Sequence, residues 1–110
     1  MRISILPSAV EDLAAGHQFY EQRETGLGAY FLDSLNADID SLQIFGGIHA
    51  IHFGRYHRLL AKRFPFAVYY TVQHEMVFVR AVLDCRRDPK WIRRHLGESG
   101  DAGVKPTTTS

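Results

Sequence analysis

Apolar positions near the start of the chain predict a strand followed by an amphipathic helix. Residues 3–6 are mostly apolar and read as a short strand. The stretch from Ser8 to Glu11 has the form of a capping box, in which a serine hydroxyl and a glutamate carboxylate satisfy backbone N–H groups at a helix start. Apolar residues then recur every three or four positions as far as Tyr20. This first helix is expected to end by Gly26.

A second apolar stripe follows almost at once. It runs through residues 31–42 at helical spacing, and the pair Gly46-Gly47 is expected to end this second helix. Because the connection between the two helices is short, we expect them to pack as an antiparallel hairpin.

The pattern then changes to the alternation and β-branched content of strands. Residues 51–53 alternate, residues 66–72 are aromatic and β-branched, and residues 76–83 form the clearest strand. The short polar stretch 73–75 predicts a hairpin turn between the last two. One face of the last strand is expected to pack under the helices, through Val77, Val79, Ala81 and Leu83.

A last short helix is predicted to begin with Asp88 as its N-cap and Pro89 in its first turn, and to end at Gly97. Residues 98–110 are rich in Gly, Thr and Ser and are expected to be a disordered polar tail after a single domain over 1–97. Consecutive strands favour antiparallel pairing. We therefore predict an α+β fold, with an N-terminal strand, a helical hairpin, a mostly antiparallel sheet of three to five strands and a short C-terminal helix, the helices gathered on one face.

Charge is divided unevenly along the chain. Residues 1–50 hold two basic and seven acidic side chains, whereas residues 51–96 hold ten basic and three acidic ones. This asymmetry favours an acidic partner for the C-terminal half, either nucleic acid or an acidic protein surface. The alternative is that the two halves neutralise each other across the fold.

Composition narrows the class of protein. The lone Cys85 cannot form an internal disulfide and has no metal-ligand spacing with any histidine, so neither a cofactor nor a metal site is expected. Apolar stretches are too short for a membrane span, and the N-terminus lacks the layout of a signal peptide. A cytoplasmic location is the default expectation.

Four segments together resemble the RelE/ParE toxin superfamily. They are 26–32 (Gly-Leu-Gly-Ala-Tyr-Phe-Leu), 58–70 (Arg-Leu-Leu-Ala-Lys-Arg-Phe-Pro-Phe-Ala-Val-Tyr-Tyr), 79–83 (Val-Arg-Ala-Val-Leu) and 86–91 (Arg-Arg-Asp-Pro-Lys-Trp). They occur in the family's order and spacing, and the resemblance covers roughly residues 2–96. The sequences of the first and last segments look more like those of ParE-like members than of RelE-like members.

The resemblance implies the toxin of a type II toxin–antitoxin system, a class linked to plasmid stabilization and growth inhibition. A cognate antitoxin would hold it inactive by wrapping it with a C-terminal segment. ParE-like members inhibit DNA gyrase without cutting RNA, and RelE-like members are ribosome-dependent mRNA endonucleases. A third possibility is a degenerate member that only binds its antitoxin.

The sequence offers basic side chains that could bind an anionic partner, but it does not offer a convincing set of catalytic groups. Cutting RNA needs a base, an acid and cations. Cations are present, and alternation would put Arg58 and Lys62 on one face of their strand, with Arg80 on the sheet face opposite the core. No histidine is tied by the sequence to a carboxylate, and Trp91 stands where relatives often carry a tyrosine or histidine. The chain is therefore expected to act without catalysis, with an mRNA endonuclease as the enzymatic alternative.

The candidate residues for binding the target or the antitoxin are basic, with one aromatic. Arg80 either contacts phosphate or target, or pairs with a carboxylate such as Asp84. Trp91 fits a packing anchor better than a stacking platform. The whole set is Arg58, Lys62, Arg63, Arg80, Arg86, Arg87 and Trp91.

Overall fold

The computed structural model describes residues 1–97, and the tail expected over 98–110 lies outside them. Five strands form one sheet in the order β1-β5-β4-β3-β2. β1 runs parallel to β5, and the other neighbouring pairs are antiparallel. The elements are β1 (Arg2–Ile5), α1 (Pro7–Arg23), α2 (Leu27–Asp40), α3 (Leu42–Phe45), β2 (Ile51–His52), β3 (Tyr56–Leu60), β4 (Phe66–Gln73), β5 (Met76–Asp84) and α4 (Pro89–His95). The predicted α+β fold is confirmed.

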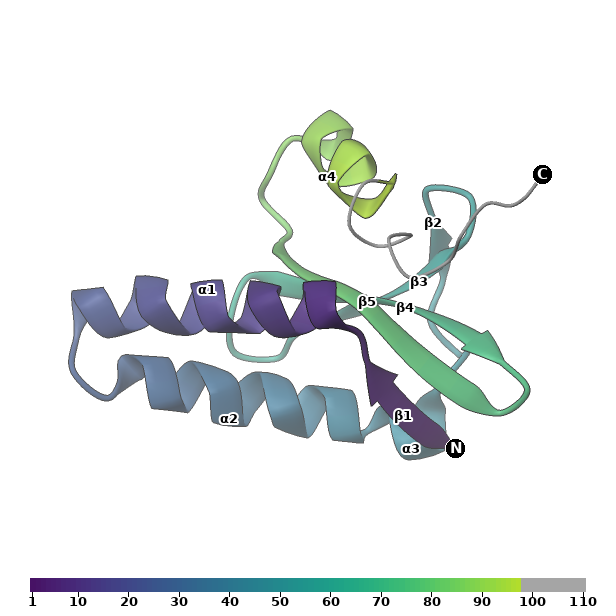
Figure 1. Ribbon diagram of the computed structural model, residues 1–110, viewed down its shortest axis with the longest axis horizontal. Helices are drawn as coiled ribbons and strands as arrows, with labels where there is room; N and C mark the ends of the chain where they lie inside the picture. Colours follow the sequence, from purple (N-terminus) through teal and green to yellow (C-terminus); the bar gives the residue numbers. More distant parts are fainter. Residues whose placement is uncertain (98–110) are drawn as a thin grey trace.

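Helices cover both faces of the sheet. α1 and α2 lie side by side as an antiparallel hairpin on one face, and α4 sits on the opposite side of β5 (Figure 1). The core under the hairpin contains Phe31, Leu35, Val77 and Val79, all fully buried. Figure 1 also shows β1 at the edge of the sheet beside α3.

The start of α1 differs from the expected capping box. Pro7 occupies the first turn, Leu6 is the N-cap residue, and no side chain caps the helix. The hydroxyl of Ser8 instead donates to the backbone oxygen of Arg80 at 2.8 Å. Because proline has no N–H and its φ already suits a helix, it can begin a helix without a polar cap. Ser8 therefore ties α1 to β5.

The helical hairpin is closed by a glutamate from α1. Gly26 adopts a φ of +92°, a left-handed conformation that favours glycine. The Glu21 carboxylate accepts from the N–H groups of Gly26 and Gly28, the latter at 2.9 Å. These hydrogen bonds lower the pKa of Glu21. α2 ends at Asp40, earlier than the Gly46-Gly47 stop, and the short α3 follows it.

A β-bulge in β5 corrects the expected packing face. Tyr70 pairs with Val79 and Tyr69 with Ala81, so Arg80 is an extra residue opposite this bend. Beyond it the alternation is reversed. Val82 packs under the hairpin, whereas Ala81 and Leu83 face the other side.

The reversed alternation creates a second core that seats α4. Tyr56 and Tyr69 are buried there together with Ile92 of α4 and Leu96, which follows α4 directly. The expectation that all helices share one face is therefore wrong, because the bulge presents apolar side chains to the opposite face as well. The predicted start of α4 is correct, since the Asp88 carboxylate accepts from the N–H of Lys90 at 2.9 Å. Among the helices of residues 1–97, none has the length and apolar character needed to cross a bilayer.

Candidate functional site

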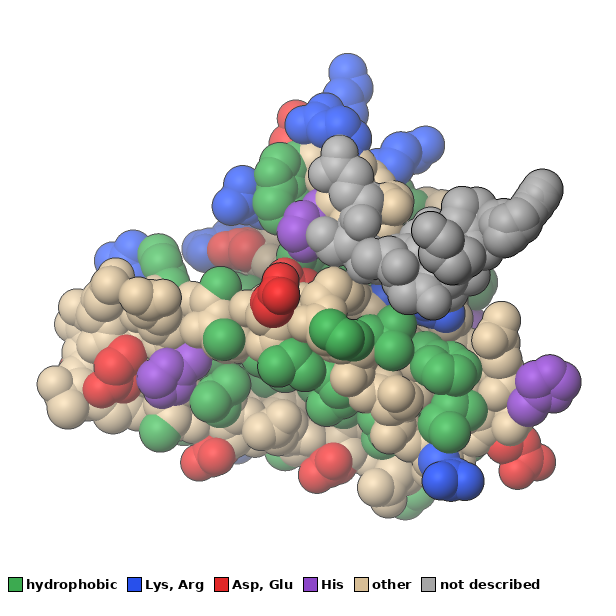
Figure 2. All heavy atoms as spheres, viewed as in Figure 1, with side chains coloured by type: hydrophobic (Ala, Val, Ile, Leu, Met, Phe, Trp, Pro, Cys, Tyr) green, Lys and Arg blue, Asp and Glu red, His purple; other side chains and the backbone are tan. Residues whose placement is uncertain are grey.

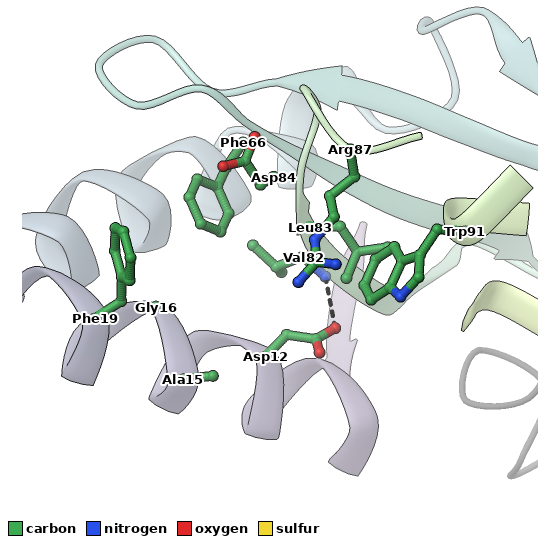
Figure 3. Close-up of a pocket in the computed structure, with 10 residues that line it drawn as sticks. All are labelled: Asp12, Ala15, Gly16, Phe19, Phe66, Val82, Leu83, Asp84, Arg87 and Trp91. Atoms are coloured by element: carbon green, nitrogen blue, oxygen red, sulfur yellow. Dashed lines mark hydrogen bonds between the residues drawn. The ribbon is translucent and has the colours of Figure 1, made fainter. Parts of the chain in front are cut away.

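A groove of about 290 Å³ lies between α1, the end of β5 and the start of α4. Its floor is largely apolar, and charged side chains stand at its rim. Figure 3 shows Phe19 and Asp12 of α1 facing Arg87 and Trp91 across this space. The lining residues are Asp12, Ala15, Gly16, Phe19, Phe66, Val82, Leu83, Asp84, Arg87 and Trp91.

Asp12 joins three elements at one end of this groove. Its carboxylate accepts from the N–H of Val82 in β5 at 3.0 Å (Figure 3). The same carboxylate lies 3.5 Å from Nε2 of His95 in α4. Burial raises the pKa of Asp12, and the Val82 hydrogen bond and His95 oppose that rise. At 3.5 Å this contact does not have the geometry of a hydrogen bond.

Trp91 anchors α4 and also forms a wall of the groove. It is half-buried against the second core, as a packing anchor would be. The His95 ring stacks on it with centroids 4.8 Å apart and planes 11° apart. The Arg87 guanidinium lies 4.0 Å from the indole centroid, a distance typical of a cation–π contact. These contacts hold Arg87 in place at the rim.

Arg86 is paired with Asp84, a residue that lines the groove. Its Nε donates to Asp84 at 3.0 Å, and its terminal nitrogen to the second carboxylate oxygen at 2.7 Å. This bidentate pair is the main reason that the pKa of Asp84 is lowered. The Arg86 side chain is still 66% exposed. A partner carboxylate could therefore compete for it.

Arg80 is not the surface cation that alternation suggested. It lies on the sheet face opposite the α1–α2 hairpin, but it is only 3% exposed. Its Nε donates to the Thr71 hydroxyl at 3.0 Å. The alternative pairing with Asp84 is wrong, because Asp84 is held by Arg86.

The candidate cations are split between the two sides of the sheet. Arg58 neighbours Tyr69 on the side that carries α4. Lys62 lies beyond the end of β3 and, with Arg63, lines a smaller cavity against α2. The expectation that Arg58 and Lys62 share a strand face is therefore wrong, since β3 ends at Leu60. Of the candidate set, Arg87 and Trp91 line the groove, and Arg86 is paired with Asp84, which also lines it.

The pairing of Asp12 with His95 was missed by the sequence reasoning. The two residues lie near opposite ends of the described chain, and no local spacing connects them. The only available signal was a polar Asp12 on a helix whose neighbours Leu13 and Gly16 are buried.

A second cluster of polar rings lies on the hairpin side of the sheet. Nδ1 of His49 is 2.5 Å from the Tyr70 hydroxyl, which also accepts from the N–H of Gly47 at 3.0 Å. The His57 ring stacks on Tyr70 with centroids 5.0 Å apart. Burial, and then His57, lowers the pKa of His49. Tyr69 and Tyr70 are both fully buried, on opposite faces of the sheet.

Comparison with known proteins gives a match in structure alone. No protein-family model matches the chain, and no curated protein sequence matches it. A solved structure described as the chromosomal ParDE TA system from P. aeruginosa matches with a TM-score of 0.68 at 17% sequence identity. The match covers 76% of this chain and 95% of that one. This chain therefore has the fold of a component of a ParDE toxin–antitoxin system.

Proposed function

We propose that this chain is the toxin of a type II toxin–antitoxin system and acts as a ParE-like inhibitor of DNA gyrase in the cytoplasm. The observation that carries this proposal is the structural likeness to a ParDE chain over 95% of that chain's length. The four sequence segments that resemble the RelE/ParE superfamily point the same way. Residues 1–97 are proposed to act as one toxin domain.

The antitoxin is proposed to bind in the groove between α1 and α4. The apolar floor, with Phe19 and Leu83, suits an apolar side chain of a bound segment. Arg87 at the rim suits a carboxylate of the same segment. Arg86 could leave Asp84 and form an ion pair with such a carboxylate instead. A C-terminal antitoxin segment with alternating apolar and acidic residues fits this surface best.

One observation favours the alternative of an mRNA endonuclease. His95 has a carboxylate neighbour in Asp12, 3.5 Å from its Nε2, and proton transfer by a histidine is commonly supported by a carboxylate close to it. The cations that would stabilise the transition state of RNA cleavage are poorly placed. Lys62 lies beside α2 and Arg80 is buried on Thr71, so neither stands beside this pair. We therefore keep gyrase inhibition as the first proposal.

A supercoiling assay tests the first proposal. Purified full chain added to gyrase and relaxed plasmid should abolish supercoiling, and the product of the neighbouring antitoxin gene should restore it. An Arg87→Gln variant should still inhibit gyrase but require more antitoxin for rescue, with His74→Gln in the exposed β4–β5 turn as the control. Full supercoiling at excess toxin would reject gyrase as the target.

Primer extension on mRNA after induction tests the alternative in the same cells. Codon-positioned ends that disappear in His95→Gln and persist in His74→Gln would establish the endonuclease instead. Normal growth on overexpression, with neither effect, would identify a member that only binds its antitoxin.

A further inference from the structure

Exposed cations gather on α4 and on the loop that leads into it. Five of the ten residues from 86 to 95 are basic and exposed, and Asp88 is the only acidic one. Figure 2 shows Lys and Arg side chains collected around α4, whereas Asp and Glu are spread along the two long helices. We call this the α4 cationic surface, made of Arg86, Arg87, Lys90, Arg93 and Arg94.

Within the described part of the chain, carboxylates neutralise little of this charge. Within residues 1–97, Arg86 is the member of the α4 cationic surface that forms an ion pair with a carboxylate. The carboxylate of Asp88 is engaged by the N–H of Lys90 as a helix cap. The remaining cations therefore project toward solvent, where a polyanion can reach them.

Aromatic rings hold two of these cations in place. Arg87 lies over Trp91 at 4.0 Å, and Arg93 lies over Phe53 at 5.5 Å from the ring centroid. The second contact extends the surface from α4 to the β2–β3 loop. A cation already ordered on a ring loses less side-chain entropy when it binds an anion. These rings are thus engaged by cations of the chain itself.

The α4 cationic surface lacks the exposed apolar side chains and free aromatic faces that other kinds of partner require. Protein interfaces bury apolar side chains at their centre. None of the exposed large apolar side chains of the described chain belongs to residues 86–97. Single-strand binders depend on bases stacking on free aromatic faces, and here Trp91 and Phe53 are covered by Arg87 and Arg93. Backbone phosphates of a duplex require only cations at suitable positions.

We propose that the α4 cationic surface binds the phosphate backbone of duplex DNA without reading its sequence. This binding does not depend on whether gyrase is the target. Arg87 is shared with the groove proposed for the antitoxin, whereas Lys90, Arg93 and Arg94 lie outside the groove lining. A toxin that holds DNA would be concentrated near enzymes that act on DNA.

Fluorescence anisotropy with the full chain and a labelled 20-base-pair duplex tests the proposal. Binding is expected at 50 mM NaCl and should weaken steeply with salt. If four phosphates are neutralised, the slope of log K against log salt is about −3.6, so affinity falls roughly 150-fold between 50 and 200 mM. Two duplexes of unrelated sequence should bind within about twofold of each other, as expected for phosphate contacts.

A matched pair of variants locates the surface. Arg93→Gln/Arg94→Gln should weaken duplex binding at least about fivefold and make the slope less negative by about 1.8, since each lost contact removes about 0.9. Arg2→Gln/Arg23→Gln removes the same charge from β1 and the end of α1, and should change affinity less than about twofold. Far-UV circular dichroism and Trp91 fluorescence verify that both variants are folded.

Four outcomes would overturn the proposal. They are no binding at 50 mM salt, equal loss in both variants, tighter binding of a single-stranded 20-mer than of the duplex, and displacement of the duplex by polyglutamate at equal charge concentration. The last would identify an acidic protein as the occupant. Growth or gyrase assays are not part of this test, so its failure leaves the proposed toxin function standing.

Discussion

The two faces of the sheet are covered in different ways. On one face, helices of 17 and 14 residues cover a core that includes Phe31, Leu35 and Val79. On the other, the seven-residue α4 is anchored in the second core by Ile92 and by Leu96 just after it. Trp91 packs at the margin of that core, and His95 lies beside Asp12. The face with the larger core supplies most of the stability, whereas the α4 face carries the groove and the exposed cations. A short element with few anchors is free to respond to a partner.

Truncating one large side chain in each core should give the largest difference. Phe31→Ala is expected to lower the free energy of unfolding by about 3–5 kcal/mol, and Ile92→Ala by about 2–3 kcal/mol. In Ile92→Ala, α4 should separate before the rest unfolds. Urea titration followed by Trp91 fluorescence, which reports on α4, should then have a lower midpoint than far-UV circular dichroism. Coincident midpoints in Ile92→Ala would show that the two faces unfold as one unit.

Adding one methyl group should test how closely the two long helices approach. A Cβ at Gly16 would lie 2.5 Å from two ring atoms of Phe31, whereas a Cβ at Gly97 would meet nothing within 4 Å. Gly16→Ala is therefore expected to cost about 1–3 kcal/mol, and Gly97→Ala should leave the melting temperature unchanged. Thermal unfolding measures both. An unchanged melting temperature for Gly16→Ala would mean that the α1–α2 contact can widen without cost.

The adjacent tyrosines provide a comparison at smaller scale. The Tyr70 hydroxyl is bonded to Gly47 and His49 on the hairpin side. Among described residues, the buried Tyr69 hydroxyl on the α4 side makes no hydrogen bond of good geometry, and Arg58 is its charged neighbour. Tyr70→Phe should cost about 1 kcal/mol, whereas Tyr69→Phe should be within about 0.5 kcal/mol of the parent. Urea unfolding of both variants measures the difference, and the reverse order would contradict the assigned hydrogen bonds.

Lowering the pH should destabilise the contact of His49 with Tyr70, and this is the smallest change in stability expected in the series. Because the pKa of His49 is lowered from 6.5, the folded state favours the neutral ring. Its contribution to stability is complete above pH 6.5 and is lost as pH falls below that value. His49→Gln should flatten the stability profile between pH 7 and pH 5. Identical profiles in parent and His49→Gln would exclude His49 as a source of the pH dependence.

Local chemistry explains which elements could be predicted from the sequence. The spacing of apolar residues identified the two long helices, and Asp88-Pro89 identified the start of α4, because each signal lies within a few residues. The capping box at Ser8 failed because the adjacent Pro7 could begin the helix alone. The contact of Asp12 with His95 and the burial of Arg80 depend on strand register and on α4, which no short segment encodes.

The extra residue at Arg80 shifts the in-and-out alternation of β5 by one position. Odd-numbered side chains of β5 point toward the hairpin before it, and even-numbered Val82 does so after it. Substituting Arg80 would keep this inversion, whereas deleting it would turn Ala81 and Leu83 to the wrong side and remove the floor under α4. The position is therefore more tolerant of a change in residue type than of a change in chain length.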